Sequence, residues 1–283
     1  MPSKITFNGS PLTLVGRRID AGSMAPDFRV ISQGLKEAGL SDFRGKVKLI
    51  SSFPSLDTPV CDLQVKEFNK KAAGLSIDIV VLGISKDLPF AQSRFCSLNE
   101  IRNESVLSDY KYSSFGLNYG LLIKELNLLA RAVLIVDKND ILRYFKIAPE
   151  LTKAVDYEDA LANLEVVLKS PPLTVKQESI GHCKPCAGAV LALPPGRPKE
   201  LLVGLAGWIL EGEKKISKEF GFRDFSEAKY FLDLLSVIAE EQGHHPEMAL
   251  VYNKLKVTLT THAAGGLTEN DFIMARIIDS MGI

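Results

Sequence analysis

Strand-length and helix-length hydrophobic patterns alternate along the first part of the chain. Apolar runs at 47–53 and 77–84 have the length of strands, and the second is almost unbroken, as in a central strand covered on both faces. Between them, Val65, Phe68 and Ala72 recur at helical spacing and predict a helix that packs on the sheet. Strands that alternate with helices predict an α/β layer fold.

Further elements complete this pattern. A short hairpin turns at Asn8-Gly9, and a second turns within 137–140. We expect strands over 5–7, 12–14, 27–31, 131–136 and 141–145, a helix that begins with Asp87 as its N-cap, and a helix over 157–168 whose residues Leu161, Leu164, Val167 and Leu168 face the sheet.

A smaller pattern occupies residues 201–283. The sequence from Trp208 to Phe222 predicts two strands, and Asp224 to Glu227 has the spacing of a capping box that begins a helix. Residues 249–261 alternate as one long strand, and a last helix begins at Thr268. We expect buried helix positions at Phe231, Leu234, Leu235, Ile238, Met274, Ile277, Ile278 and Met281. This order predicts an α+β domain, with an antiparallel sheet and helices on one face.

Two proline-rich interruptions separate these patterns. They are Pro171-Pro172 and the segment 193–198, with Cys183-Lys184-Pro185-Cys186 between them. A chain of 283 residues is long enough for two hydrophobic cores. We therefore expect a domain over 1–169, a linker with an attached arm over 170–200, and a second domain over 201–283.

Charge and composition limit the partners. The chain has 34 basic and 34 acidic residues, and this balance attracts neither nucleic acid nor an anionic membrane. The first sixteen residues lack a signal-peptide pattern, and no apolar run approaches eighteen residues, so we expect a soluble, cytoplasmic protein. Four cysteines are too few and too scattered for a disulfide scaffold.

Cys61 lies where the strand that ends near Phe53 gives way to a helix, after a stretch rich in proline, serine and threonine. In the first turn of a helix, unpaired backbone N–H groups and the helix dipole favour a thiolate over a thiol. Thr58, one turn earlier, can donate its hydroxyl group to the sulfur. An inert core cysteine is the alternative, but a proline-bracketed corner is a poor place for one. We therefore expect Cys61 to be reactive.

The segments Pro54 to Cys61, Asp87 to Cys96 and Leu129 to Val133, with the leading hairpin, resemble bacterial thiol peroxidase, an atypical two-cysteine peroxiredoxin with a thioredoxin-like fold. The resemblance implies reduction of hydrogen peroxide and organic hydroperoxides. It makes Cys61 the peroxidatic and Cys96 the resolving cysteine, with Thr58 and Arg131 stabilising the thiolate and the peroxide. Thioredoxin would reduce the Cys61–Cys96 disulfide of the cycle.

The residues alone leave other interpretations open. A lone arginine such as Arg131 is commonly part of a surface ion pair, and Cys96 also fits a core cysteine. Asp62 departs from the expected chemistry, because a carboxylate that pointed at Cys61 would disfavour a thiolate. We expect Asp62 to face solvent instead, where it favours the N-terminus of the helix.

Three of the four histidines lie between His244 and His262. Glu240 to Glu247, Tyr252 to Lys254, Thr260 to His262 and Gly266 to Asp271, with Trp208 upstream, resemble pterin-4a-carbinolamine dehydratase over about residues 180–283. The resemblance implies a tetrahydropterin carbinolamine as the substrate. Dehydration needs groups that exchange protons near neutral pH, which suits imidazoles. The residues implied as acid–base groups are His244, His245 and His262, and those implied as pterin-binding are Glu240, Trp208 and Asp271.

Three alternatives remain for the histidines and their domain. The histidines could bind zinc, although the rings of adjacent histidines point apart, or they could be structural. The family has an aromatic residue where this chain has Met248, so a stacking surface for the pterin is lost. The second domain could therefore serve only as a dimerisation or binding module.

The Cys183–Cys186 pair also has more than one interpretation. It could be a second redox pair, half of a zinc site with His182, or an N-terminal arm of the second domain, which we favour because no strand-to-helix context surrounds it. We expect a bifunctional fusion that binds no cofactor and no metal ion. Its expected partners are peroxide, the pterin, thioredoxin and further copies of the chain.

Overall fold

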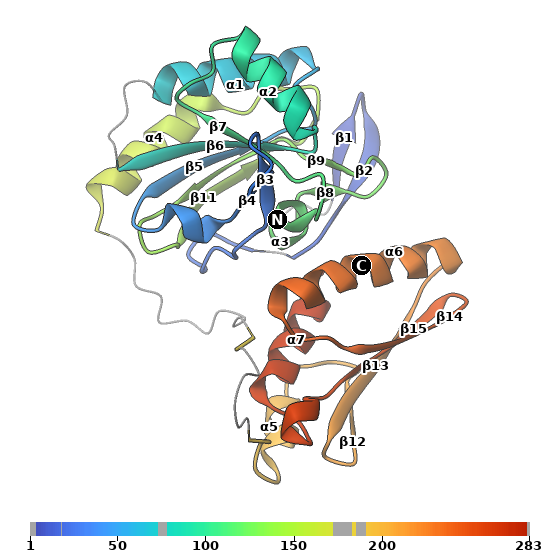
Figure 1. Cartoon of the computed structure of the whole chain (residues 1–283). Helices are drawn as coiled ribbons and strands as arrows, with labels where there is room; N and C mark the ends of the chain where they lie inside the picture. The colour runs from blue at the N-terminus through green and yellow to red at the C-terminus, as the bar shows by residue number, and fades with distance from the viewer. Residues whose placement is uncertain (1–3, 18, 73–77, 172–182, 185–190, 282–283) are drawn as a thin grey trace. The chain divides into compact units, whose positions relative to one another are not determined.

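The computed structural model describes residues 4–17, 19–72, 78–171, 183–184 and 191–281, and the chain divides near residue 180 into two compact units (Figure 1). Within the described ranges, no helix is both long and apolar enough to cross a membrane. Each unit has its own sheet and its own buried residues, as the two separate sequence patterns predict.

The N-terminal unit is built on a seven-stranded sheet. Its order is β11 (Leu142–Ile147), β10 (Ala132–Val136), β5 (Val47–Ser52), β6 (Ile79–Ser85), β7 (Ser105–Ser108), β3 (Val30–Ser32) and β4 (Glu37–Ala38). Strands β5, β6 and β7 run parallel, and β10, β11 and β3 pair antiparallel with their neighbours. The predicted central position of β6 is confirmed.

Helices and a small sheet cover this large sheet on both faces. Consecutive residues Leu49 and Ile50 of β5 enter different cores, because side chains alternate along a strand. The core of Leu49 includes residues of α1 (Pro59–Ala72) and α4 (Tyr157–Lys169). The core of Ile50 includes residues of α3 and the small sheet. The remaining elements are β1 (Lys4–Phe7), β2 (Ser10–Val15), β8 (Leu122–Ile123), β9 (Leu128–Leu129), α2 (Pro89–Leu98), α3 (Ser114–Asn118) and the 3₁₀ turn η1 (Leu40–Phe43).

Three details of the predicted N-terminal unit are wrong. The strand expected over 27–31 is the shorter β3, and Leu168 of α4 is 40% exposed while Ala160 occupies the buried face. Asp87 is not the N-cap of α2, since Leu88 holds that position without a side-chain hydrogen bond. The carboxylate of Asp87 accepts hydrogen bonds from the loop between β5 and α1 instead.

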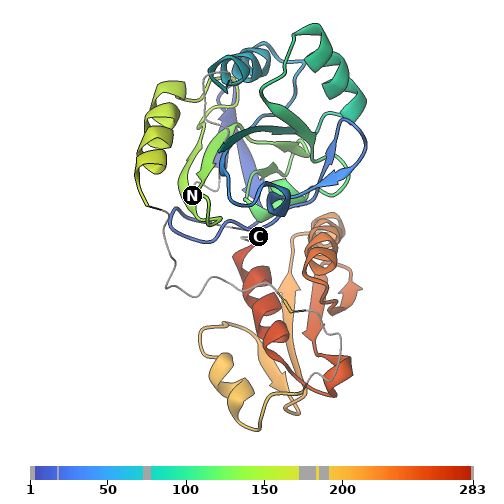
Figure 2. The same ribbon diagram turned by 60° about the vertical axis from the view of Figure 1, so that its left-hand side comes forward.

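The C-terminal unit is an antiparallel sheet with helices on one face, as predicted. Its strand order is β12 (Ile209–Glu211), β13 (Lys215–Gly221), β15 (Lys254–Leu259) and β14 (Glu247–Val251). Helices α6 (Phe225–Gln242) and α7 (Glu269–Ser280) contact each other and β15 (Figure 2). Leu255, Val257 and Leu259 are buried, whereas Lys254 and Lys256 are exposed. The short elements are α5 (Arg197–Leu201) and the 3₁₀ turn η2 (His262–Ala264).

The single long strand predicted over 249–261 is wrong. The chain reverses between Val251 and Lys254, which pair across a two-residue turn, and β14 and β15 form a hairpin. Tyr252 adopts a left-handed φ of 49°, and Asn253 Nδ2 donates to the carbonyl oxygen of Phe222 at 2.7 Å. Asparagine supports such turns by hydrogen bonding through its side chain.

Candidate active sites

Cys61 lies in the first turn of α1, where the loop after β5 ends. Its side chain is fully buried, in contrast to the expectation that such a corner would not bury a cysteine. Thr58 Oγ1 donates a hydrogen bond to Cys61 Sγ at 2.7 Å, the contact predicted from their spacing. The hydroxyl group is also 3.2 Å from the carbonyl oxygen of Ser55, its alternative acceptor.

Arg131 supplies the second contact to the sulfur. The residue precedes β10, is 1% exposed, and donates from Nη2 to Cys61 Sγ at 3.2 Å. Its other acceptors are neutral: Gln64 Oε1 at 2.7 Å and the carbonyl oxygen of Leu151. The alternative of a surface ion pair is wrong, since no described carboxylate lies within ion-pair distance of Arg131. A buried cation is costly without a counter-charge, and a thiolate at Cys61 would provide one.

Gln64 is a residue of this site that the sequence reasoning missed. It is fully buried on α1, three residues after Cys61, so both side chains lie on the same helix face. Its Nε2 donates to the carbonyl oxygen of Ser52, and its Oε1 accepts from Arg131. A polar residue at a position on the buried face of the helix is the signal that could have identified Gln64.

Asp87 holds the loop that carries Cys61. Its carboxylate accepts from the Ser55 hydroxyl group at 2.7 Å, the Leu56 N–H at 2.8 Å and the Ser85 hydroxyl group at 2.7 Å. The loop is thereby tied to the end of β6. Asp62 pairs with Lys66 at 2.7 Å on the same helix and is partly exposed, as expected for a carboxylate that faces solvent.

Cys96 lies on α2 and is buried in the same apolar cluster as Cys61 and Phe53. Both cysteines are free thiols in this structure. Gln33 Nε2 donates to Cys96 Sγ at 3.2 Å, so the two sulfurs have different partners. Burial raises the pKa of the Cys96 thiol above its usual range, the Gln33 hydrogen bond lowers it, and the nearby Glu104 raises it.

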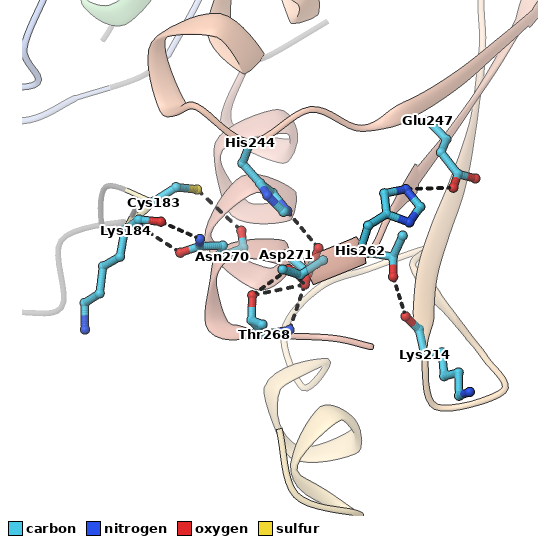
Figure 3. A network of polar contacts seen from close by, with 11 residues as sticks. Cys183, Lys184, Lys214, His244, Glu247, His262, Thr268, Asn270 and Asp271 are labelled. Carbon is cyan, nitrogen blue, oxygen red and sulfur yellow. Dashed lines mark hydrogen bonds and ion pairs between the residues drawn. The ribbon is translucent and has the colours of Figure 1, made fainter. Parts of the chain in front are cut away.

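His244 is the buried histidine of the second unit. It follows the C-cap Gly243 of α6, and its Nε2 lies 2.8 Å from Asp271 Oδ1 in the first turn of α7 (Figure 3). Asp271 Oδ2 accepts from the Thr268 N–H at 2.7 Å and the Thr261 hydroxyl group at 2.9 Å. An ionised carboxylate can only accept a hydrogen bond, so an ionised Asp271 would orient a His244 ring that donates from Nε2 and would leave Nδ1 as the second ring nitrogen.

His262 and His245 are exposed and have carboxylate partners of their own. His262 Nε2 lies 3.5 Å from Glu247 Oε1 of β14, and His245 Nε2 lies 2.9 Å from Glu240 Oε1. Figure 3 shows His262 pointing to Glu247, while the His244 ring points to Asp271. The rings of His244 and His245 thus have different partners, as expected for adjacent residues.

Asp271 connects His244 to the segment that carries His262. It contacts His244 directly and the Thr261 hydroxyl group next to His262. Asp271 is fully buried, and its carboxylate is in contact with His244, Thr261 and Thr268.

Trp208 does not join this group. Its indole N–H donates to Asp279 Oδ1 at 3.1 Å. Asp279 is eight residues after Asp271 on α7, a separation of roughly 12 Å along the helix.

The described part of the Cys183 arm is fastened to the helix ends that carry His244 and Asp271. The Cys183 N–H donates to Gln242 Oε1 at 3.0 Å, and its sulfur lies 3.6 Å from the carbonyl oxygen of Asn270. Lys184 and Asn270 exchange two hydrogen bonds at 2.9 and 2.8 Å (Figure 3). His182 and Cys186 lie outside the described residues. Within the described part of the chain, no group of three or more His, Cys, Asp or Glu residues could hold a metal ion.

Comparison with known proteins assigns both units. Residues 20–163 match the protein-family model described as Redoxin. The chain belongs to the Redoxin family. Residues 193–281 match the model described as Pterin 4 alpha carbinolamine dehydratase, so this Redoxin chain also carries a region of that second family.

Three relatives illustrate the two matches. The thiol peroxidase of Bacillus subtilis is 45% identical over 59% of this chain and 99% of its own. The crystal structure of a peroxiredoxin-like protein from Aquifex aeolicus is 36% identical over 59% of this chain and 98% of its own, with a TM-score of 0.56. A transcriptional coactivator/pterin dehydratase from Brucella melitensis is 38% identical over 32% of this chain and 99% of its own, with a TM-score of 0.31.

Proposed function

We propose that the N-terminal unit reduces hydrogen peroxide and organic hydroperoxides, and that the C-terminal unit dehydrates 4a-hydroxytetrahydropterins to quinonoid dihydropterins. The observation that carries the first activity is the pair of donors on Cys61 Sγ, Thr58 Oγ1 at 2.7 Å and Arg131 Nη2 at 3.2 Å. A hydroxyl donor and a buried cation beside one sulfur can stabilise negative charge that moves from the sulfur to a peroxide oxygen during attack.

In the first step, the Cys61 thiolate attacks a peroxide oxygen. An S–O bond forms, the O–O bond breaks, and the sulfur gives two electrons to the peroxide. The leaving oxygen takes up a proton and departs as water or an alcohol, and Cys61 becomes a sulfenic acid. Arg131 and Thr58 are placed to stabilise the negative charge that moves from sulfur to oxygen.

In the second step, the Cys96 thiol attacks the sulfenic sulfur of Cys61. The S–S bond forms, the S–O bond breaks, and the leaving hydroxide departs as water with the proton of Cys96. A thioredoxin-type dithiol then reduces the disulfide by exchange and becomes oxidised itself. No resident cofactor is needed for this cycle.

Peroxide consumption with thioredoxin and thioredoxin reductase tests this activity. Cys61→Ser should abolish turnover, whereas Cys183→Ser should leave it unchanged, because Cys183 belongs to the second unit. Cys96→Ser should consume one equivalent of peroxide and then stop at the sulfenic acid, detectable by a dimedone adduct. Full turnover by Cys61→Ser would contradict the assignment.

For the second activity, the supporting observation is the buried His244–Asp271 pair with the exposed His262 on the neighbouring segment. Dehydration breaks a carbon–oxygen bond, protonates the leaving hydroxide and removes a proton from a ring nitrogen. His244, with its orientation fixed by Asp271, and His262 are our two acid–base candidates. His245 faces Glu240 and is assigned a smaller role.

Carbinolamine dehydration measured by ultraviolet absorbance tests this proposal. His244→Ala and His262→Ala should each lower kcat strongly, and His245→Ala should lower it much less. If the wild-type protein shows no dehydration, the second unit acts as a dimerisation or binding module. Met248 is the observation that favours this alternative, since it stands on β14 where the family has an aromatic residue.

We also infer that the chain forms homo-oligomers in the cytoplasm. Both resemblances support this proposal. Size-exclusion chromatography with light scattering tests the oligomeric state, and a mass of 31.0 kDa would show a monomer.

A further inference from the structure

Glu104 is a buried carboxyl group that the peroxidase chemistry above does not use. Glu104 is the last residue of the connection between α2 and β7, and it is 5% exposed. Neither side-chain oxygen has a hydrogen-bond partner. Buried polar groups are nearly always hydrogen-bonded, so this exception requires a physical explanation.

The carboxyl group lies beside the apolar cluster that surrounds the two reactive cysteines. A Cβ atom added to Gly83 of β6 would meet Glu104 Oε1 at 2.5 Å and Phe53 Cε1 at 3.3 Å. Phe53 belongs to the cluster that holds Cys61 of α1 and Cys96 of α2. The titratable group of this cluster that interacts electrostatically with Glu104 is the Cys96 thiol, and Arg131 contacts Cys61 of the same cluster; no described cation pairs with Glu104.

Burial alone raises the pKa of Glu104 well above its usual range. The closed protein therefore keeps this carboxyl group neutral at pH values where an exposed glutamate is ionised. The connection that carries Glu104 is held closed by α1, because Asn69 Oδ1 accepts from the backbone N–H groups of Arg102 and Asn103 at 2.9 and 2.8 Å.

Formation of the Cys61–Cys96 bond requires movement in this region. A disulfide brings two sulfurs to about 2.0 Å, whereas here both thiols are free and have different hydrogen-bond partners. Opening of α2 and its connection to β7 would release Cys96 and would expose Glu104 to water at the same time.

We propose that Glu104 is a positioning residue for Cys96. The carboxyl group of Glu104 stays neutral while α2 is closed and loses its proton to water when α2 opens. This proposal rests on the resolving role of Cys96 described above. Above the ordinary glutamate pKa of about 4.3, the closed state binds one proton more than the open state, so a rise in pH favours opening of α2. The equilibrium constant for opening of α2 therefore rises by up to about tenfold per pH unit. It levels off above the raised pKa that Glu104 has in the closed state.

Native-state hydrogen exchange of the α2 amides between pH 5 and pH 7.5, below the range in which an exposed cysteine ionises, tests the proposal without requiring enzymatic activity. In the wild-type protein, the opening equilibrium, corrected for intrinsic exchange, should rise with pH. Glu104→Gln is neutral in both states and should remove this dependence. Glu100→Gln, an exposed glutamate on the same connection, is the matched control and should behave as wild type.

Glu104→Leu provides a second variant, because it removes the buried polar group altogether and should keep α2 closed at every pH. After one equivalent of peroxide at pH 8, both Glu104 variants should form the disulfide several-fold more slowly than wild type and should accumulate more sulfinic acid with excess peroxide. Equal pH dependence of opening in wild type and Glu104→Gln would overturn the proposal. A protein that lacks peroxidase activity but retains the exchange difference would instead contradict only the proposed function.

Discussion

Arg131 shows how a single residue can define a reactive centre. Its guanidinium group is buried, its oxygen acceptors are neutral, and the remaining acceptor is Cys61 Sγ. Thr58 adds a neutral donor to the same atom. Both groups act at short range on the sulfur, so substitutions there should change peroxide reactivity, and replacement of Arg131 should also lower stability because Gln64 and Leu151 would lose their donor.

Thr58 permits a matched test of the hydroxyl donor. Thr58→Val keeps the side-chain shape but removes the hydrogen bond to Cys61 Sγ, and we expect the second-order rate constant with peroxide to fall about 10- to 100-fold. Thr58→Ser keeps the hydroxyl group and should retain most of the rate. Stopped-flow kinetics measure both, and an unaffected valine variant would show that the hydroxyl group does not contribute.

Asp271 permits a comparable test in the second unit. Asp271→Asn replaces an acceptor of the His244 contact by an amide, which disturbs the orientation and proton position of the ring. We expect kcat for dehydration to fall about 100-fold with a smaller change in KM. Glu240→Gln is the control, since its partner His245 is exposed, and it should change kcat by less than about threefold. An effect on KM alone would indicate that Asp271 acts in binding.

At the scale of elements, sequence patterns predict correctly those features that depend on interactions within one helix. The buried stripe of α6 and the capping box Thr268–Asp271 both follow from spacing within one helix. Asp87 was misassigned because its carboxylate is used by Ser55 and Leu56, residues about thirty positions away. The sequence predicts one strand in place of the β14–β15 hairpin because strand-like residues stand on both sides of Tyr252 and Asn253, with no glycine or proline to mark the turn.

The candidate sites show the same limit. Family motifs led to Cys61, Arg131 and His244, but the contacts of Gln64 and Asp271 depend on tertiary packing. Gln64 and Asp271 are buried, and burial cannot be read from their positions in the sequence. Sequence alone does not show that Trp208 is hydrogen-bonded to Asp279.

The N-terminal hairpin β1–β2 is held to the domain by Glu150. Hydrogen bonding, chiefly from Thr6, lowers the pKa of Glu150 to about 2. A lowered pKa stabilises the folded protein above the ordinary value, and this contribution is lost as pH falls from about 4.3 towards 2. Glu150→Gln should therefore destabilise the protein at pH 6 but much less at pH 3, as measured by urea unfolding. Glu158→Gln, at an exposed position of α4, should show no such pH-dependent difference.

At the scale of the whole molecule, one chain carries two compact units that match two different protein families. A covalent link raises the local concentration of each unit for the other but does not by itself couple their reactions. We therefore expect Cys61→Ser to leave the dehydration rate within about twofold of wild type, and His244→Ala to leave peroxide turnover similarly unchanged. Both rates can be measured on one preparation, and a loss of both in either variant would demonstrate coupling.

The Cys183 arm has a practical consequence for dissecting the protein. The family match of the second unit begins at residue 193, yet Cys183 and Lys184 bind Gln242 and Asn270 at the two helix ends nearest His244. A fragment cut at residue 193 would leave those side chains without their partners, whereas one cut upstream of the arm would keep them. The excised unit with the arm should therefore be the more stable of the two, and the natural edge of this domain lies before Cys183.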